Sequence, residues 1–166
     1  MPCWSFIHPS AQKGYSEKFG RYGLGGDDQV DALGGDDNAY GDTGNDTNYG
    51  GEGWDTLDGG HPDSPEPGND RLFGGVGQDS LYGDDGNDFL HGGAATDAFF
   101  DEGGKDQIKG GSGSDRIETG LIWRQGFATP DGVVDTVDCG SDTDTVYFQK
   151  GSDKINANCE IKKPYR

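Results

Sequence analysis

An aspartate recurs every nine residues over most of this chain of 166 residues. In the stretch 74–118, each block of nine has Asp at its sixth place and an apolar residue at its eighth. Glycine fills most first, second and fourth places, where its access to positive φ lets the backbone turn tightly and approach a ligand. Carbonyl and carboxylate oxygens suit a hard cation such as Ca²⁺, which takes roughly six to eight of them. The spacing therefore predicts a series of calcium-binding turns.

The nine-residue frame runs from residue 23 to residue 118 and gives ten repeats, one of which carries an insert at 61–66. All ten sixth places are aspartate, and these are the predicted carboxylate ligands: Asp28, Asp37, Asp46, Asp55, Asp70, Asp79, Asp88, Asp97, Asp106 and Asp115. The predicted carbonyl ligands belong to Gly23, Gly25, Gly41, Gly50, Gly51, Gly53, Gly59, Gly60, Gly74, Gly75, Gly77, Gly83, Gly92, Gly93, Gly110, Gly111 and Gly113.

The last three residues of each repeat have the pattern of a very short strand, with the eighth side chain facing a core. Nine of the ten eighth places are apolar, and Asn48 is the exception. Two repeats would make one coil of eighteen residues, so successive turns fall on opposite edges. Turns n and n+2 would then stack about 4.8 Å apart, the spacing of neighbouring strands. An ion between two stacked turns could share the aspartates of both.

The charge of the chain supports bound cations independently. Its formal net charge is −18, and stacked carboxylates about 5 Å apart would repel one another in a metal-free coil. Ten repeats allow at most eight sites between next-but-one neighbours, so we expect up to about eight Ca²⁺ ions, whose binding energy would become folding energy. The alternative for any single aspartate is a turn residue that caps its own backbone.

Three repeats, GGEGWDTLD (50–58), GGVGQDSLY (74–82) and GGSGSDRIE (110–118), match the pattern G-G-x-G-x-D-x-U-x at every fixed place. This pattern resembles the RTX, or haemolysin-type, calcium-binding repeat. The resemblance is strong over 23–118 and weak over 130–156. It implies an all-β fold, a right-handed parallel β-roll with rows of Ca²⁺ along both edges. It also implies an extracellular or cell-surface bacterial protein that folds where calcium is millimolar.

The flanking segments depart from the frame. Residues 1–22 are rich in aromatic residues and are predicted as an N-terminal cap over the first open rung, with a disordered end as the alternative. Residues 119–129 form an insert. The frame resumes at 130–156 with few glycines, and we expect the whole segment 130–166 to act as degenerate repeats and a C-terminal cap.

Cys139 and Cys159 flank the last repeat-like stretch. A disulfide between them would stabilise the C-terminal end by about 3 kcal/mol and would fit an oxidising exterior. Two free buried thiols are the alternative, and Cys3 has no partner in either case. No pair of cysteines has the CxxC spacing of a zinc site.

No catalytic residues are predicted, since the chain has neither HExxH nor GxSxG. The acidic charge argues against nucleic acid as a partner. The chain has no run of 18 apolar residues, so no membrane span is expected. We therefore expect a secreted or surface structural module. The alternative is a calcium-dependent adhesion or ligand-binding module with a protein or carbohydrate partner. Its contacts would come from the insert 119–129, which contains Trp123 and Phe127, or from ninth-place aromatic residues. Of the latter, Tyr82 and Phe100 lie two repeats apart and hence on one face.

Overall fold

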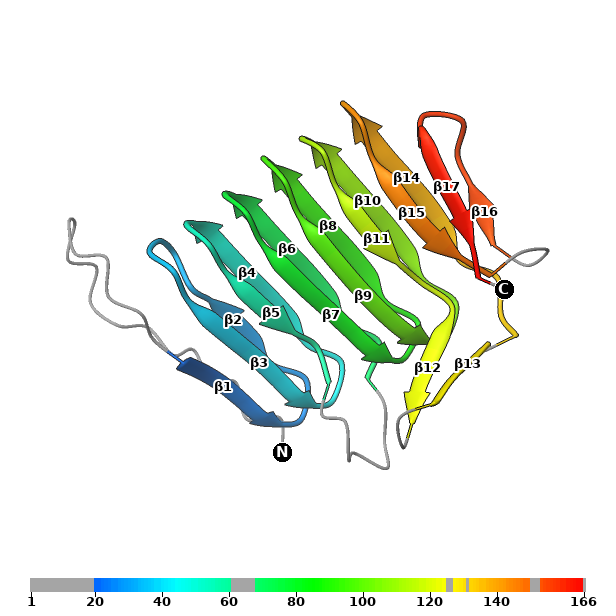
Figure 1. Ribbon diagram of the computed structural model, residues 1–166. Helices are drawn as coiled ribbons and strands as arrows, with labels where there is room; N and C mark the ends of the chain where they lie inside the picture. The colour runs from blue at the N-terminus through cyan, green and yellow to red at the C-terminus, as the bar shows by residue number, and fades with distance from the viewer. Residues whose placement is uncertain (1–19, 61–67, 125–126, 131, 150–152, 166) are drawn as a thin grey trace.

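The computed structural model describes residues 20–60, 68–124, 127–130, 132–149 and 153–165. These residues form strands and turns without a helix. The chain alternates between two parallel sheets, so that it advances as a stack of coils (Figure 1). The all-β parallel β-roll expected from the sequence is confirmed.

The first sheet has eight strands in the order β1, β3, β5, β7, β9, β11, β15 and β17. Their bounds are Gly20–Gly25 for β1, Asn38–Thr43 for β3, Thr56–Asp58 for β5, Ser80–Asp85 for β7, Ala98–Gly103 for β9, Arg116–Glu118 for β11, Thr145–Phe148 for β15 and Ile161–Pro164 for β17.

The second sheet has seven strands in the order β16, β14, β10, β8, β6, β4 and β2. Their bounds are Lys154–Ile155 for β16, Thr136–Ser141 for β14, Gln107–Ser112 for β10, Phe89–Ala94 for β8, Arg71–Val76 for β6, Thr47–Glu52 for β4 and Gln29–Asp31 for β2. Every pairing within the two sheets is parallel, and strands of next-but-one repeats pair at equivalent places, as where Leu57 pairs with Leu81. The exception is the pairing of β7 with β9, whose register shifts where Asp84 pairs with Asp101.

The core consists of the eighth-place side chains, which point between the sheets because strand residues alternate between two faces. Each sheet contributes one column, and these side chains are at most 2% exposed: Ala39, Leu57, Leu81, Phe99, Ile117 and Val146 on the first sheet, and Val30, Asn48, Leu72, Leu90, Ile108 and Val137 on the second. Asn48 is fully buried, and its Nδ2 donates a hydrogen bond of 2.9 Å to the carbonyl of Asp58. The polar exception is thus accommodated by a partner on the facing sheet.

The turns explain where glycine is placed in the repeat. Most second and fourth places adopt positive φ, as at Gly51 (107°) and Gly53 (141°). Leu33 at a second place and Ala95 at a fourth place also adopt positive φ, at 74° and 83°. The turn conformation is therefore imposed by the stacked coil, and glycine is the residue that adopts it without strain.

The two ends of the roll differ from the repeats. β1 begins at Gly20 and pairs Tyr22 with Tyr40, so the first strand starts inside the segment predicted as the N-terminal cap. Residues 1–19 lie outside the described part. At the other end, Ile161–Pro164 pairs with β15 and so joins the tail to the first sheet. The predicted disulfide between Cys139 and Cys159 is confirmed.

Both inserts follow the second place of an odd-numbered repeat, counted from residue 23, so the described residues before them, Gly60 and Gly120, lie on the same edge of the roll. The first insert, 61–66, lies outside the described residues. Within the second, β12 (Leu121–Arg124) and β13 (Phe127–Pro130) pair as an antiparallel hairpin that projects from the lower edge in Figure 1. Thr119 and Gly120 remain buried in the coil, so the chain departs from the coil only at Leu121.

Candidate metal centre

The ten predicted aspartates lie in two columns inside the roll, one along each edge. Odd-numbered repeats form edge one and even-numbered repeats form edge two. On edge one lie Asp28, Asp46, Asp70, Asp88 and Asp106, and on edge two lie Asp37, Asp55, Asp79, Asp97 and Asp115. All ten are between 1% and 9% exposed. The stacking of next-but-one turns that the spacing predicts therefore brings these carboxylates together.

In eight of the ten aspartates, Oδ1 joins two neighbouring turns of the same edge by accepting from the backbone of the preceding aspartate in the column. The backbone N–H of Asp46 donates to Oδ1 of Asp70 at 2.7 Å, and that of Asp97 donates to Oδ1 of Asp115 at 2.8 Å. The same kind of hydrogen bond recurs beyond the ten repeats. The backbone N–H of Asp115 donates to Oδ1 of Asp144, and that of Asp144 donates to Oε2 of Glu160. Glu160 was missed by sequence reasoning, because it lies in the tail where no frame is visible.

In eight of the ten aspartates, and in Asp144, the second carboxylate oxygen is buried and accepts no hydrogen bond from the described residues. These atoms are the Oδ2 atoms of Asp46, Asp55, Asp70, Asp79, Asp88, Asp97, Asp106, Asp115 and Asp144. A buried anionic oxygen without a donor is costly to maintain, since nothing replaces the water that solvated it in the unfolded chain. A row of bound cations along each edge would satisfy these oxygens.

The first-place glycines leave open the space beside these oxygens. A Cβ added to Gly50 would lie 2.6 Å from Oδ2 of Asp55 and 2.6 Å from the carbonyl oxygen of Gly74. The position without a side chain is thus flanked by a carboxylate and by a carbonyl of the next turn on the same edge. This oxygen-only surrounding fits Ca²⁺.

The predicted carbonyl ligands occupy three kinds of position. First-place glycines are buried in the coil: Gly23, Gly41, Gly50, Gly59, Gly74, Gly83, Gly92 and Gly110. Second-place and fourth-place glycines are half-buried on the turns: Gly51, Gly60, Gly75, Gly93 and Gly111, and Gly53, Gly77 and Gly113. Gly25 is exposed at a third place. Next-but-one turns stack so closely that a methyl group on Gly77 would overlap the carbonyl of Gly53.

The pKa values show how unfavourable two rows of charged carboxylates are without cations. Burial raises the pKa of Asp46 and Asp79 to about 6. Burial, with a smaller contribution from neighbouring carboxylates, raises the pKa of Asp88 and Asp97 to about 8. In the metal-free coil, these groups would therefore take up protons near neutral pH, whereas a bound cation would keep them ionised.

A second ladder on edge one was also missed. The fifth places of alternate repeats are Asp27, Asn45, Asn69 and Asn87, and each asparagine Nδ2 donates to Oδ1 of the preceding member at 2.8–3.0 Å. The signal in the sequence is that Asp or Asn occupies the fifth place in every second repeat from the first to the seventh. Such asparagine stacking stabilises the turns of one edge.

Comparison with known proteins agrees with the geometry. The family model of the RTX calcium-binding nonapeptide repeat matches the chain in four copies, at residues 22–47, 33–60, 66–99 and 91–121. Neither a curated protein nor a solved structure matches the chain. The described residues contain no helix long and apolar enough to cross a membrane.

Proposed function

Since the chain belongs to the family of RTX calcium-binding nonapeptide repeat proteins, we propose that it is a structural module whose folding is coupled to Ca²⁺. The observation that carries this proposal is the pair of aspartate columns, in which eight of the ten sixth-place aspartates have a buried Oδ2 that accepts no hydrogen bond from any described residue. Bound calcium would supply positive charge at these oxygens. The chain's own residues supply the Oδ2 ligands, and the first-place glycines supply the space.

The coupling follows from what the metal-free coil lacks. Apart from Asn48, the core between the sheets is a double column of single apolar side chains, with one to each repeat, and the formal charge is −18. A core this thin offsets little of the ordering entropy, and the facing carboxylates oppose closure. Binding free energy gained only in the closed coil therefore adds directly to the stability of the folded state.

We propose up to about eight ions, one for each pair of stacked turns among the ten repeats. Proteins with these repeats are typically secreted by bacteria, and an extracellular or surface location would supply both the calcium and the oxidising conditions that the Cys139–Cys159 disulfide requires. The proposed role is structural, and we assign no catalytic residues.

A second candidate role, adhesion or ligand binding, is favoured by the outward face of the first sheet. The rings of Tyr82 and Phe100 stack at 5.0 Å, and those of Tyr22 and Tyr40 stack at 4.8 Å. Stacked, half-exposed aromatic rings suit a carbohydrate or protein partner. The serine double variant Tyr82→Ser/Phe100→Ser would lose such a partner while still folding with calcium, whereas a purely structural module would lose only stability.

The test of the main proposal is a Ca²⁺ titration of the metal-free chain followed by far-UV circular dichroism, with Mg²⁺ as the control. We expect a steep transition from coil to β structure with Ca²⁺ and no transition at equal Mg²⁺, because Mg²⁺ requires a smaller, near-octahedral site. A chain that is already rich in β structure in excess chelator would contradict the proposal.

A further inference from the structure

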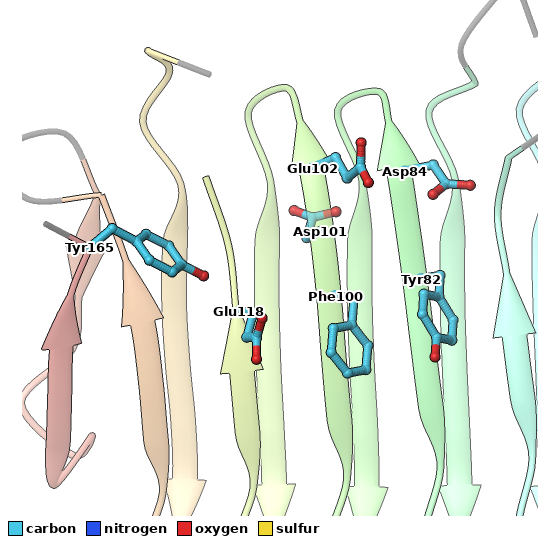
Figure 2. A pocket seen from close by; sticks show the side chains of 7 residues that line it. All are labelled: Tyr82, Asp84, Phe100, Asp101, Glu102, Glu118 and Tyr165. Atoms are coloured by element: carbon cyan, nitrogen blue, oxygen red, sulfur yellow. The ribbon is translucent and has the colours of Figure 1, made fainter. Parts of the chain in front are cut away.

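One repeat places an aspartate where its neighbours have the first-place glycine. The repeat 101–109 reads DEGGKDQIK, so Asp101 takes the position whose open space lies beside a sixth-place carboxylate. Asp101 is only 4% exposed. Figure 2 shows it on β9 between Phe100 and Glu102.

The side chain of Asp101 reaches the carboxylates of two stacked turns on edge one. Carboxylate oxygens of Asp88, Asp101 and Asp106 lie within 4.8 Å of one another. Ligand atoms 2.3–2.6 Å from a common ion can be roughly this far apart. Three carboxylates thus converge at this point of the edge, where sequence reasoning assigned two.

Both oxygens of Asp101 are buried and accept no hydrogen bond from the described residues, and Oδ2 of Asp88 and Oδ2 of Asp106 are in the same state. Four anionic oxygen atoms therefore face a space from which protein donors are missing. A cation is the group that satisfies all of them together.

The backbone has adjusted to accept this side chain. The pairing of β7 with β9 is irregular at this point, where Asp84 pairs with Asp101 before Asp85 pairs with Gly103. A Cβ at other first places would press on a carboxylate and on a carbonyl, as at Gly50. The irregular register makes the room that an aspartate needs and a glycine does not.

The next turn on edge one also has another residue in place of the first-place glycine, but there the neighbouring carboxylate is satisfied without a cation. Thr119 also occupies a first place, and its Oγ1 donates a hydrogen bond of 2.6 Å to Oδ2 of Asp135. That hydroxyl satisfies the sixth-place carboxylate directly. Asp101 instead brings two further acceptors close to Asp106, whose Oδ2 already accepts no hydrogen bond from the described residues. Threonine at the first place therefore disfavours a bound cation, whereas aspartate at the first place favours one.

We propose that Asp101 is a direct cation ligand, and that it makes the site between repeats 83–91 and 101–109 the tightest Ca²⁺ site of the roll. The inference rests on the proposed function and adds to it a residue and an order of filling. A third carboxylate raises the attraction for a divalent cation, and ligand charge is one of the features that set Ca²⁺ affinity. This site fills first and fixes the coils on either side of it.

The test is a Ca²⁺ titration of the full chain in competition with a chromophoric chelator, which gives stepwise affinities and the number of ions. The wild type should show one step about tenfold or more tighter than the rest. Asp101→Gly restores the usual residue of the repeat and should weaken that step about tenfold or more while keeping the number of ions. Asp31→Asn removes one exposed charge from the second sheet and should leave the step unchanged.

The variant Asp101→Asn distinguishes two possible roles of Asp101. One is a cation ligand, and the other is a protonated carboxyl group that hydrogen-bonds to Asp106. The amide keeps the shape but lacks the charge, so the tight step should weaken as it does with glycine. Asp101→Thr copies Thr119 and should reduce the number of bound ions by one, because the hydroxyl would satisfy Asp106 itself.

An unchanged tight step in Asp101→Asn would overturn the inference, and so would an equal loss in Asp31→Asn, which would show an effect of net charge alone. In either case Ca²⁺-driven folding of the wild type would persist, and the proposed function would stand. A wild type that takes up no Ca²⁺ would instead refute both.

Discussion

The backbone N–H of Asp79 donates to Oδ1 of Asp97 at 2.9 Å, while Oδ2 of Asp97 is buried and has no donor among the described residues. The two oxygens of one carboxylate thus have separate roles. Oδ1 joins two turns of the backbone, and Oδ2 is left for a cation. The same division recurs along both edges, and it allows the two roles to be separated by mutation.

The variant Asp97→Asn keeps an oxygen that can accept from Asp79 and replaces the charged Oδ2 by an NH₂ group. We expect the Ca²⁺ midpoint of folding to rise about tenfold, because the two sites that share Asp97 lose a ligand. Far-UV circular dichroism during a Ca²⁺ titration measures this midpoint. Asp31→Asn, an exposed change of equal charge, serves as the control. Equal midpoints for the two variants would contradict the role of Oδ2.

The metal-free chain should fold better in mild acid than at alkaline pH. Folding raises the pKa of Asp88 and Asp97 from 3.8 to about 8, and that of Asp46 and Asp79 to about 6, chiefly through burial. A raised carboxyl pKa favours the folded state below pH 3.8, and this stabilisation is lost as the pH rises through the folded-state values.

Circular dichroism of the metal-free chain should therefore show more β structure at pH 5.5 than at pH 8.5, and Ca²⁺ should restore the β structure at pH 8.5. The lower pH lies above the isoelectric point of about 4.2, which limits precipitation. More β structure at pH 8.5 than at pH 5.5 without metal would contradict this assignment.

The substitution Gly77→Ala should prevent two turns of edge two from stacking. Gly77 has a φ of 135°, and its added methyl group would overlap the carbonyl of Gly53. Positive φ costs about 1–2 kcal/mol for alanine, and the overlap adds about 1–3 kcal/mol. Thermal unfolding of the calcium-loaded chain measures the total.

Gly26→Ala is the matched control for this substitution. Gly26 occupies the same place of the repeat with a φ of 107°, and no described atom lies within 4 Å of its Cβ position. It should show the cost of positive φ without the overlap. Equal losses of stability in the two variants would show that turn stacking tolerates a methyl group at the fourth place.

Removal of the disulfide by Cys139→Ser/Cys159→Ser should destabilise the C-terminal end by about 3 kcal/mol, given a sequence separation of 20 residues. The repeats at 23–118 should still fold with calcium, since each coil contacts only its neighbours. Hydrogen exchange measured along the chain distinguishes the two regions. Cys3→Ser is the control, and uniform loss of protection in the double variant would contradict local stabilisation.

The repeat itself determines a large part of this structure. A period of nine with Asp at six and an apolar residue at eight gives two repeats to a coil and places next-but-one turns on one edge. The register between Leu81 and Phe99 and the column from Asp79 to Asp97 follow from that spacing alone. Periodic side chains can be placed from sequence because every coil repeats the same local geometry.

Features that break the period were decided by the tertiary structure. No pattern in the sequence shows that Glu160 ends the column of edge two, that Thr119 satisfies Asp135, or that β1 starts at Gly20. Each depends on which chain segments lie next to one another after an insert or at an end. The convergence of Asp101 with Asp88 and Asp106 is the clearest case, because residues five and thirteen positions away meet only when the coil closes.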